Sequence, residues 1–215
     1  MIELYTWGTP NGHKANIMVE EVGAEYVVKP IDIGKGDQKT PEFLAINPNG
    51  RIPAIVDVVD GKRIRVFESG AILVYLAEKF GKLLPKDPEQ RAEVLGWTFW
   101  QVGGLGPMIG QWGFFSRQQE KNEGALKRYF DESVRLYDVL DARLQGREYL
   151  AGEYSIADIA CYSWAKGGLS FLGKAHPELQ QRFPAVNAWI ERLDARPAVK
   201  KGMGIPEKTA PVKEA

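Results

Sequence analysis

The stretch Asn47–Asp57, NPNGRIPAIVD, decides the fold because it joins a strong turn signal to a short strand that opens with a proline. Another β-prone run, Arg63–Phe67, follows across Asp60-Gly61. This spacing predicts a β-hairpin whose turn lies within Asp57–Ile64. A helix is predicted directly afterwards, over Ala71–Phe80, because its apolar residues recur at steps of three and four.

The segment before this hairpin alternates strand and helix signals. Ile2–Trp7 is a short β-prone run, His13–Val22 is predicted to be helical, and Tyr26–Ile33 is a second strand. These elements make a β-α-β unit to which the hairpin and its helix are added. We therefore predict a thioredoxin-like domain over residues 1–81, with the order β-α-β-α-β-β-α.

The rest of the chain is predicted to be helical. A linker at 82–88 precedes an all-helical domain over 89–201, and 202–215 is expected to be a tail that is mobile or lies over a surface. The glycine- and aromatic-rich stretch Gly103–Ser116 is expected to bend or interrupt a long helix. Four segments carry apolar residues at helical spacing, namely Gln90–Trp100, Ala125–Leu144, Ile156–Trp164 and Ala185–Ala195.

The composition narrows the classes of partner. The 215 residues are 44% hydrophobic, which is enough for a core, and carry 28 basic against 28 acidic side chains. This balance leaves no excess positive charge for a nucleic acid backbone or an anionic membrane. The longest apolar runs, such as Ala71–Ala77, are too short to span a bilayer, and Met1 leads straight into a strand without a signal peptide. We therefore expect a cytoplasmic protein with neither nucleic acid nor membrane as a partner.

Cysteine and histidine are scarce. Cys161 is the only cysteine, and His13 and His176 are the only histidines. One cysteine allows neither an internal disulfide nor a Cys-x-x-Cys redox pair, and the histidines have no carboxylate partners at metal-ligand spacing. We assign no metal. Because Cys161 lies on the apolar side of a predicted helix, we expect a buried structural thiol.

Two motifs beside the hairpin, Ile52-Pro53 and Glu68-Ser69, can each be interpreted as part of a ligand site or as ordinary local structure. A cis bond at Ile52-Pro53 would turn the Ile52 backbone outward to pair with the backbone of a ligand's cysteinyl residue, whereas a trans proline at a strand edge is the commoner case. At the entrance to a helix, Ser69 could hold the α-carboxylate of a γ-glutamyl group while the Glu68 carboxylate faces its ammonium. The same pair also makes a plain helix cap.

Thr9 and Asn11 lie where the first helix begins, so the positive end of the helix dipole could stabilise a thiolate beside them. Turn and cap chemistry explains the same residues without a ligand. Tyr5, in the preceding strand, is a rival hydroxyl for the same task. His13 and Lys14 are expected to face solvent or an interface.

Together these motifs resemble the glutathione transferase superfamily over nearly the whole chain. The N-terminal half carries the resemblance through NPNG, IPAI and FESGAI, and the C-terminal half through YSIADI, in which Ser155 and Asp158 are expected to form a capping box. The segments TPNGHK, GKG with Gln38, and FWQVGGLGPM look like the bacterial Nu class. That class is Ure2-like, being similar to the yeast nitrogen regulator Ure2 and to a disulfide-bond oxidoreductase of enteric bacteria.

The resemblance implies roles for individual residues. Thr9 and Asn11 would act at the sulfur of glutathione, Glu68 and Ser69 would hold its γ-glutamyl end, and Gln38 would contact its glycyl end. Arg128 would support glutathione from the helical domain, although an exposed helix arginine explains that residue equally. The glutathione-binding set is thus Asn11, Gln38, Ile52, Glu68, Ser69 and Arg128.

From this resemblance we predict a glutathione-dependent disulfide-bond oxidoreductase with peroxidase activity, in which glutathione is a cosubstrate and supplies the reactive thiolate. A homodimer is expected, as is usual in the family. Two alternatives stay open. One is a non-enzymatic glutathione-binding regulator, and the other is a conjugating transferase whose apolar pocket would be formed by Trp112, Phe114, Phe115 and Trp164.

Overall fold

The computed structural model describes residues 1–207 and divides into two compact units. The first contains residues 1–76 together with the C-terminal segment from Pro197, and the second contains residues 77–196. Each unit has its own buried core. Among the described residues, no helix is long and apolar enough to cross a membrane.

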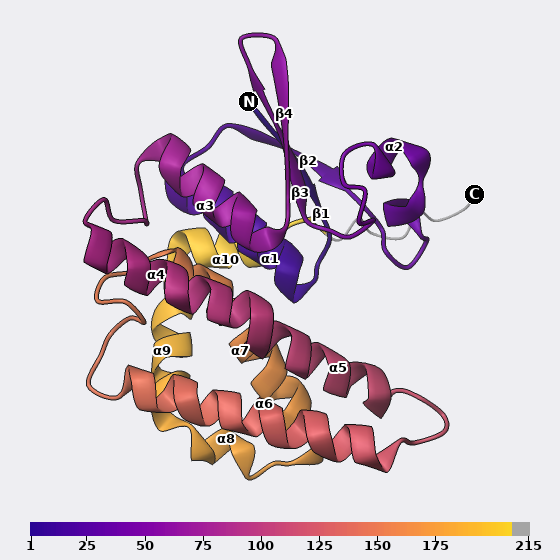
Figure 1. The fold of residues 1–215 in the computed structure, drawn as a ribbon, viewed down its shortest axis with the longest axis vertical. Helices are drawn as coiled ribbons and strands as arrows, with labels where there is room; N and C mark the ends of the chain where they lie inside the picture. Colours follow the sequence, from indigo (N-terminus) through magenta and orange to yellow (C-terminus); the bar gives the residue numbers. More distant parts are fainter. Residues whose placement is uncertain (208–215) are drawn as a thin grey trace. The chain divides into compact units, whose positions relative to one another are not determined.

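The first unit is built on one four-stranded sheet with the order β2-β1-β3-β4 (Figure 1). β1 runs parallel to β2, and β3 runs antiparallel to both β1 and β4. The parallel β1–β2 pair requires a crossover, which α1 provides. The strands are β1 (Ile2–Thr6), β2 (Tyr26–Pro30), β3 (Ala54–Val59) and β4 (Lys62–Phe67).

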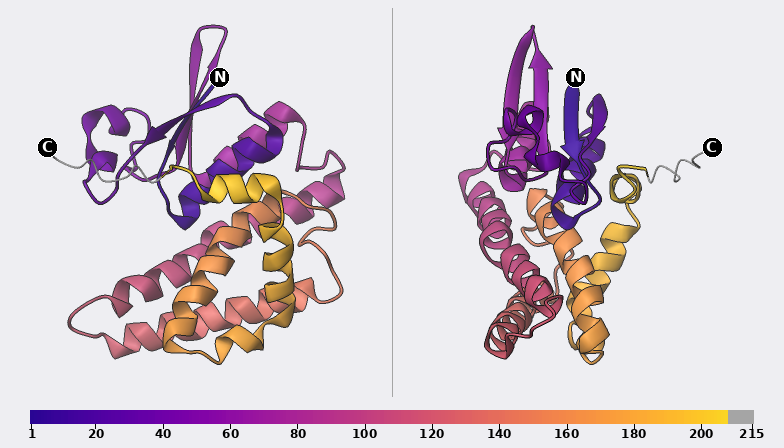
Figure 2. Two further views of the ribbon diagram at one scale, coloured as in Figure 1. Left: turned by 180° about the vertical axis from the view of Figure 1, so that it is seen from behind. Right: turned by 90° about the vertical axis from the view of Figure 1, so that its right-hand side faces the viewer.

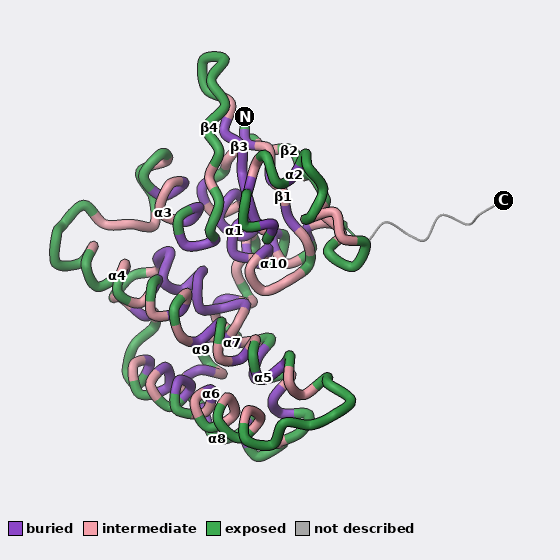
Figure 3. The backbone as a smooth tube through the Cα atoms, turned by 45° about the vertical axis from the view of Figure 1, so that its right-hand side comes forward, coloured by how far each residue is buried: buried purple, intermediate pink, exposed green. Residues whose placement is uncertain are grey.

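The β3–β4 hairpin has a tighter turn than the sequence predicts. Both strands run further than expected, so that Val59 pairs with Lys62 and only Asp60-Gly61 joins them. Both turn residues have positive φ, 48° for Asp60 and 75° for Gly61, which matches the right-handed twist of the paired strands. The tip of this hairpin is exposed, whereas β1 is largely buried (Figure 3).

Three helices complete the predicted order of the first domain. They are α1 (Pro10–Val22), α2 (Pro41–Leu44) and α3 (Ser69–Phe80), with a short 3-10 turn at Asp37–Lys39 before α2. The core joins central strands to buried helix faces through fully buried side chains such as Leu4, Ile17, Ile55 and Ile72. The thioredoxin-like fold class is therefore confirmed.

The C-terminal helix α10 (Pro197–Met203) belongs to the first unit, where it packs on α1 (Figure 2). A Cβ atom on Gly202 would lie 2.6 Å from the Cα of Ile17, and the side-chain amide of Asn16 donates to the carbonyl of Ile205 at 2.8 Å. Residues 197–201, which the sequence places at the end of the helical domain, therefore belong to the first compact unit. Gly202 allows the backbone of α10 to approach that of α1 closely. Residues 208–215 of the expected tail lie outside the described residues.

The second unit is helical, as predicted. Each of the four predicted segments is helical and reaches beyond its expected limit at one end, most of all α7, which continues to Ala175. The helices are α4 (Pro88–Trp100), α5 (Gly106–Ser116), α6 (Glu123–Leu144), α7 (Ile156–Ala175), α8 (Leu179–Arg182) and α9 (Pro184–Asp194). The short helix α8 is not predicted from the sequence.

The glycine-rich stretch interrupts a long helix, as the sequence predicts. Gln101–Leu105 forms a π-helical turn between α4 and α5. Its glycines admit a neighbouring helix of the same chain, since a Cβ atom on Gly106 would lie 3.2 Å from the indole nitrogen of Trp164 and one on Gly113 would lie 3.0 Å from Phe171. Both aromatic residues belong to α7.

The predicted capping box at the start of α7 is present. The Asp158 carboxylate accepts from the backbone N–H of Ser155 at 3.0 Å, and also from the backbone N–H of Leu150 at 3.1 Å. The indole N–H of Trp189, from α9, donates to the same carboxylate at 2.9 Å. Burial raises the pKa of Asp158 to about 6, although these hydrogen bonds act in the opposite direction.

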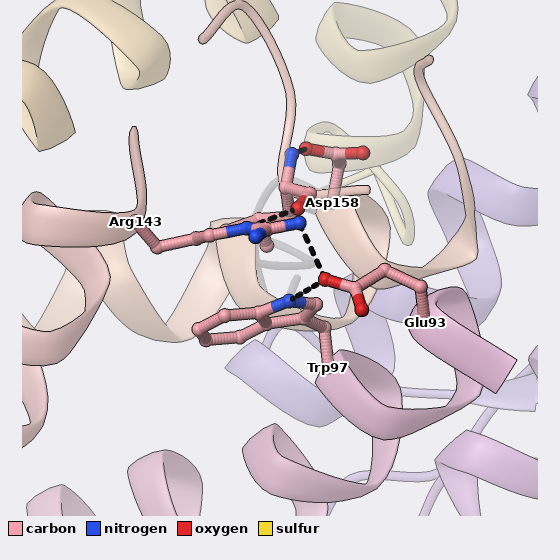
Figure 4. A network of polar contacts seen from close by, with 5 residues as sticks. Glu93, Trp97, Arg143 and Asp158 are labelled. Atoms are coloured by element: carbon pink, nitrogen blue, oxygen red, sulfur yellow. Dashed lines mark hydrogen bonds and ion pairs between the residues drawn. The ribbon is translucent and has the colours of Figure 1, made fainter. Parts of the chain in front are cut away.

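The capping box continues into a polar network toward α4 and α6 (Figure 4). Arg143 donates from Nε to the carbonyl of Leu150 at 2.7 Å, and its guanidinium also bonds the Glu93 carboxylate. Glu93 in turn accepts from the indole N–H of Trp97 at 3.0 Å. Hydrogen bonds thereby link α4, α6 and α9 to the buried Asp158 carboxylate of α7.

Candidate functional site

The start of α1 lies against the end of β1. Thr9 caps the helix, and its side-chain oxygen accepts from the backbone N–H of Gly12 at 3.1 Å. A Cβ atom on Gly12 would lie 2.1 Å from the carbonyl oxygen of Trp7, so only glycine admits this approach. A hydroxyl that accepts in this way still has its own hydrogen to donate, and the half-buried Asn11 lies in the same first turn. Two polar side chains therefore accompany the positive end of the helix.

Tyr5, the other candidate for activating the thiol, already uses its hydroxyl in a hydrogen bond. Its hydroxyl donates to the Glu3 carboxylate at 2.9 Å, and the guanidinium of Arg63 donates to both oxygens of Glu3 at 3.1 and 2.7 Å. The Arg63 hydrogen bond lowers the pKa of Glu3, and burial together with Glu3 raises the pKa of Tyr5. A phenol with a raised pKa that already donates to a carboxylate is poorly suited to stabilise a thiolate.

Glu68 and Ser69 stand at the entrance of α3. Glu68 is exposed, and its φ of +70° places a non-glycine residue in the left-handed region. Such a conformation is uncommon for a residue with a side chain, and strained residues of this kind cluster at functional sites. Its carbonyl accepts from the backbone N–H of Ile72 at 2.9 Å, so the pair does begin the helix. Ser69, by contrast, is only 7% exposed.

Lys14 is not a surface residue, which corrects the sequence expectation. Its side chain is only 1% exposed, and its Nζ donates to the Ser69 hydroxyl oxygen at 3.2 Å. Helical spacing explains the placement, because Lys14, Met18 and Val22 are four residues apart and all are buried on α1. His13 is half-buried, and burial lowers its pKa.

Gln38 lies in the 3-10 turn before α2. Its amide nitrogen donates to the carbonyl of Ile33 at 3.5 Å, while its amide oxygen is buried with no hydrogen-bond partner among the described residues. Gly50 packs against this turn, with a φ of +60° and an added Cβ 3.0 Å from the carbonyl oxygen of Gln38. The Asn47–Gly50 turn is thereby placed beside Gln38.

The same turn leads directly to Ile52. Asn47 is 1% exposed, and its amide donates to the carbonyl of Arg51 at 2.6 Å while its oxygen accepts from the backbone N–H of Asn49 at 3.0 Å. The Ile52-Pro53 peptide is cis, the less common of the two conformations considered. The structure thus brings Gln38 close to the turn before Ile52, and Ser69 close to Lys14.

Lys14 is the residue that sequence reasoning missed. A signal was available, because its four-residue spacing from Met18 and Val22 places it on an apolar helix face. The roles expected of the other site residues in this unit stay predictions. Arg128 lies exposed on α6 in the second unit, and its role also stays a prediction.

Cys161 is fully buried in α7, which confirms the expectation for this thiol. Its sulfur lies 4.0 Å from the carbonyl oxygen of Trp97. A thiol in such surroundings is shielded from solvent and from substrates.

The aromatic residues expected to form an apolar pocket differ in their surroundings, and Trp164 lies against Gly106 on the buried side of the interrupted helix. Trp112 is 6% exposed and packs edge-on against Phe171, with ring centroids 4.9 Å apart. Phe114 is 52% exposed, and Phe115 stacks on Tyr129 at 5.6 Å. Core packing therefore accounts for Trp112, and Phe114 lies at the surface.

Comparisons with known proteins agree with this architecture. Residues 1–78 match the family model of the glutathione S-transferase N-terminal domain, and residues 107–197 match that of the C-terminal domain. The disulfide-bond oxidoreductase YfcG of Escherichia coli is 46% identical over 208 residues, covering 94% of each chain.

Solved structures are similar as well. A glutathione transferase from Burkholderia graminis, with two glutathione molecules bound per subunit, superposes with a TM-score of 0.91 and 44% identity over 97% of this chain and 89% of that one. A glutathione transferase from Pseudomonas putida, with one glutathione disulfide per subunit, has a TM-score of 0.90 and 42% identity over 95% and 91% of the two chains. The chain therefore belongs to the glutathione S-transferase family.

Proposed function

We propose that this protein is a glutathione-dependent disulfide-bond oxidoreductase of the Nu class that uses the thiolate of bound glutathione. The observation that carries the proposal is the burial of Cys161, the only cysteine of the chain. A disulfide reductase with no accessible thiol of its own must take its nucleophile from a cosubstrate. The name of the relative YfcG and the ligands of the two similar structures support the same reaction and cosubstrate.

The start of α1 activates the thiol of bound glutathione. A free thiol has a pKa of about 8.5, so only a small fraction is ionised at neutral pH. The positive end of α1, the Thr9 hydroxyl and Asn11 together favour the thiolate of glutathione and lower its pKa. Tyr5 takes no part, because its hydroxyl donates to Glu3.

The reaction proceeds by two exchanges. The bound thiolate attacks one sulfur of the substrate disulfide, forms a mixed disulfide and releases the other half as a thiolate, which takes up a proton. A second glutathione thiolate then attacks the glutathione sulfur of the mixed disulfide. Glutathione disulfide forms and the remaining substrate thiol leaves, so two glutathione molecules are oxidised for each disulfide reduced. With a hydroperoxide, the same thiolate attacks the terminal peroxide oxygen, the O–O bond breaks, and an alcohol leaves after protonation while the glutathione sulfur becomes a sulfenic acid. A second glutathione then attacks that sulfur, which releases water and forms glutathione disulfide.

Binding follows from the two helix entrances of the first unit. Ser69 and the start of α3 hold the α-carboxylate of the γ-glutamyl group, and the exposed Glu68 carboxylate holds its ammonium. The Ile52 backbone pairs with the cysteinyl residue, and Gln38 contacts the glycyl end. Arg128, in the second unit, is assigned to glutathione by the family resemblance alone.

A cytoplasmic homodimer is part of the proposal. The homodimer follows from the family resemblance, and an interface between subunits would cover exposed aromatic side chains such as Phe99 (57% exposed), Phe114 (52%) or Phe67 (39%).

The decisive experiment compares Asn11→Ala with Cys161→Ala in a glutathione-dependent reduction of a model disulfide. We expect Asn11→Ala to lower kcat/KM by about tenfold or more, because a polar group at the developing thiolate is lost, and Cys161→Ala to retain most activity. Equal loss in both variants would contradict the proposal. Faster turnover of a chloronitrobenzene than of the disulfide would favour the conjugating transferase, and glutathione binding without any turnover would favour the regulator.

A further inference from the structure

The first unit buries a lysine directly behind the residue expected to hold the γ-glutamyl group. Lys14 and Ser69 are 55 residues apart in sequence, and their side chains meet at 3.2 Å with exposed fractions of 1% and 7%. An ammonium withdrawn from water loses much hydration free energy unless opposite charge and hydrogen bonds replace it. A lysine is therefore an unusual choice for an apolar helix face that also buries Met18 and Val22.

The direction of the Lys14–Ser69 hydrogen bond has a chemical consequence. An ammonium carries three donors and no acceptor, so the Ser69 oxygen must accept. The hydroxyl hydrogen of Ser69 is then directed toward another acceptor. Because Ser69 is the first residue of α3, an acceptor placed there also meets the backbone N–H groups of the first helical turn.

We propose that Lys14 is the positioning residue for the α-carboxylate of glutathione, acting through Ser69 from the buried side. This inference rests on the proposed function. The ammonium orients the Ser69 hydroxyl as a donor and supplies a buried positive charge to an anion that the helix end also attracts. Glu68, exposed at the same helix entrance, is left for the ammonium of the ligand. Lys14 thereby makes the site selective for an amino-acid head group over a simple amine.

The test compares two ligands. One is glutathione, and the other is γ-aminobutyryl-cysteinyl-glycine, which differs only by lacking the α-carboxylate. Calorimetric titration should show that the wild-type protein prefers glutathione by about tenfold or more, as expected for a charge-assisted contact. In Lys14→Met, which keeps most of the unbranched side chain and removes the charge, the affinity for glutathione should fall while that for the analogue changes little. Lys14→Arg should retain most of the preference.

Two controls separate positioning from general damage. Lys62→Met removes an exposed lysine of β4 and should leave both affinities unchanged. In a Ser69→Ala background, Lys14→Met should reduce the preference less than it does in the wild type, because Lys14 acts through the missing hydroxyl.

A preference for glutathione that persists in Lys14→Met would overturn this role while leaving the proposed function intact. Failure of the wild-type protein to bind glutathione at all would overturn both. If Lys14→Met does not fold, the NMR signal of the Lys14 side chain in isotope-labelled wild-type protein decides, since it should shift with glutathione and not with the analogue.

Discussion

The indole N–H of Trp189 donates to the Asp158 carboxylate at 2.9 Å, so a residue of α9 completes the cap that begins α7. The same carboxylate accepts backbone hydrogen bonds from Ser155 and Leu150. Local capping and long-range packing of the helical unit therefore share one buried group.

The buried Asp158 carboxylate predicts a specific pH dependence of the free energy of unfolding. Burial raises the pKa of Asp158 from 3.8 to about 6 in the folded protein. The folded state then holds a proton more tightly than the unfolded state, so the contribution of Asp158 to the free energy of unfolding falls as the pH rises between these two values. Over this whole pH range the effect amounts to about 3 kcal/mol, at 1.36 kcal/mol for each pKa unit.

Urea unfolding of the wild type and of Asp158→Asn at two pH values checks this prediction. The variant should be less stable throughout, by about 1–3 kcal/mol, because an amide nitrogen cannot accept the hydrogen bonds that the carboxylate accepts. The advantage of the wild type should be larger at pH 4.5 than at pH 7. An advantage that grows with pH would show that Asp158 is not the group described.

A second prediction concerns which hydroxyl acts on the thiol. Tyr5→Phe should leave glutathione-dependent disulfide turnover within about twofold of the wild type, because the Tyr5 hydroxyl donates to Glu3. Thr9→Val should lower kcat/KM by about tenfold or more, and Thr9→Ser, which keeps the hydroxyl, should recover most of the loss. Steady-state kinetics with glutathione in excess measure both, and a large loss in Tyr5→Phe alone would transfer the role to Tyr5.

A third prediction concerns the contact between α1 and β1. Gly12→Ala places a Cβ atom 2.1 Å from the carbonyl oxygen of Trp7, which must move apart. We expect a loss of about 3 kcal/mol in unfolding free energy, at the upper end for overpacking. Gly96→Ala is the matched control, because nothing lies within 4 Å of its added Cβ in α4, and it should stabilise by about 0.5–1 kcal/mol. Similar denaturation midpoints for the two variants would contradict the close approach.

A fourth prediction concerns the docking of α10. An alanine at Gly202 would bring its Cβ within 2.6 Å of the Cα of Ile17, so α10 should loosen from α1 at a cost of about 1–3 kcal/mol. At Gly204 the nearest atom would be 3.4 Å away, an ordinary contact, and alanine should be tolerated. Hydrogen exchange of the α1 amides, compared between the two variants, tests the docking. Equal protection in both variants would place α10 away from α1.

Much of the candidate site could be anticipated from short motifs. The cap by Thr9, the cis Ile52-Pro53 peptide and the Glu68-Ser69 helix start all occur where the sequence motifs place them. Lys14 could not be assigned to Ser69 in the same way, because only the packing of α1 beside α3 brings the two side chains together.

The amino-acid sequence by itself determined the order of strands and helices in the first domain, the position of Asp60-Gly61 within the hairpin turn, and the capping box of α7, because each depends mainly on local residue patterns. Tertiary structure alone decided that Lys14 is buried against Ser69, that Trp189 completes the Asp158 cap, and that α10 joins the first unit. These contacts join residues that are 31 or more positions apart. Their formation depends on how whole elements pack, which no local pattern specifies.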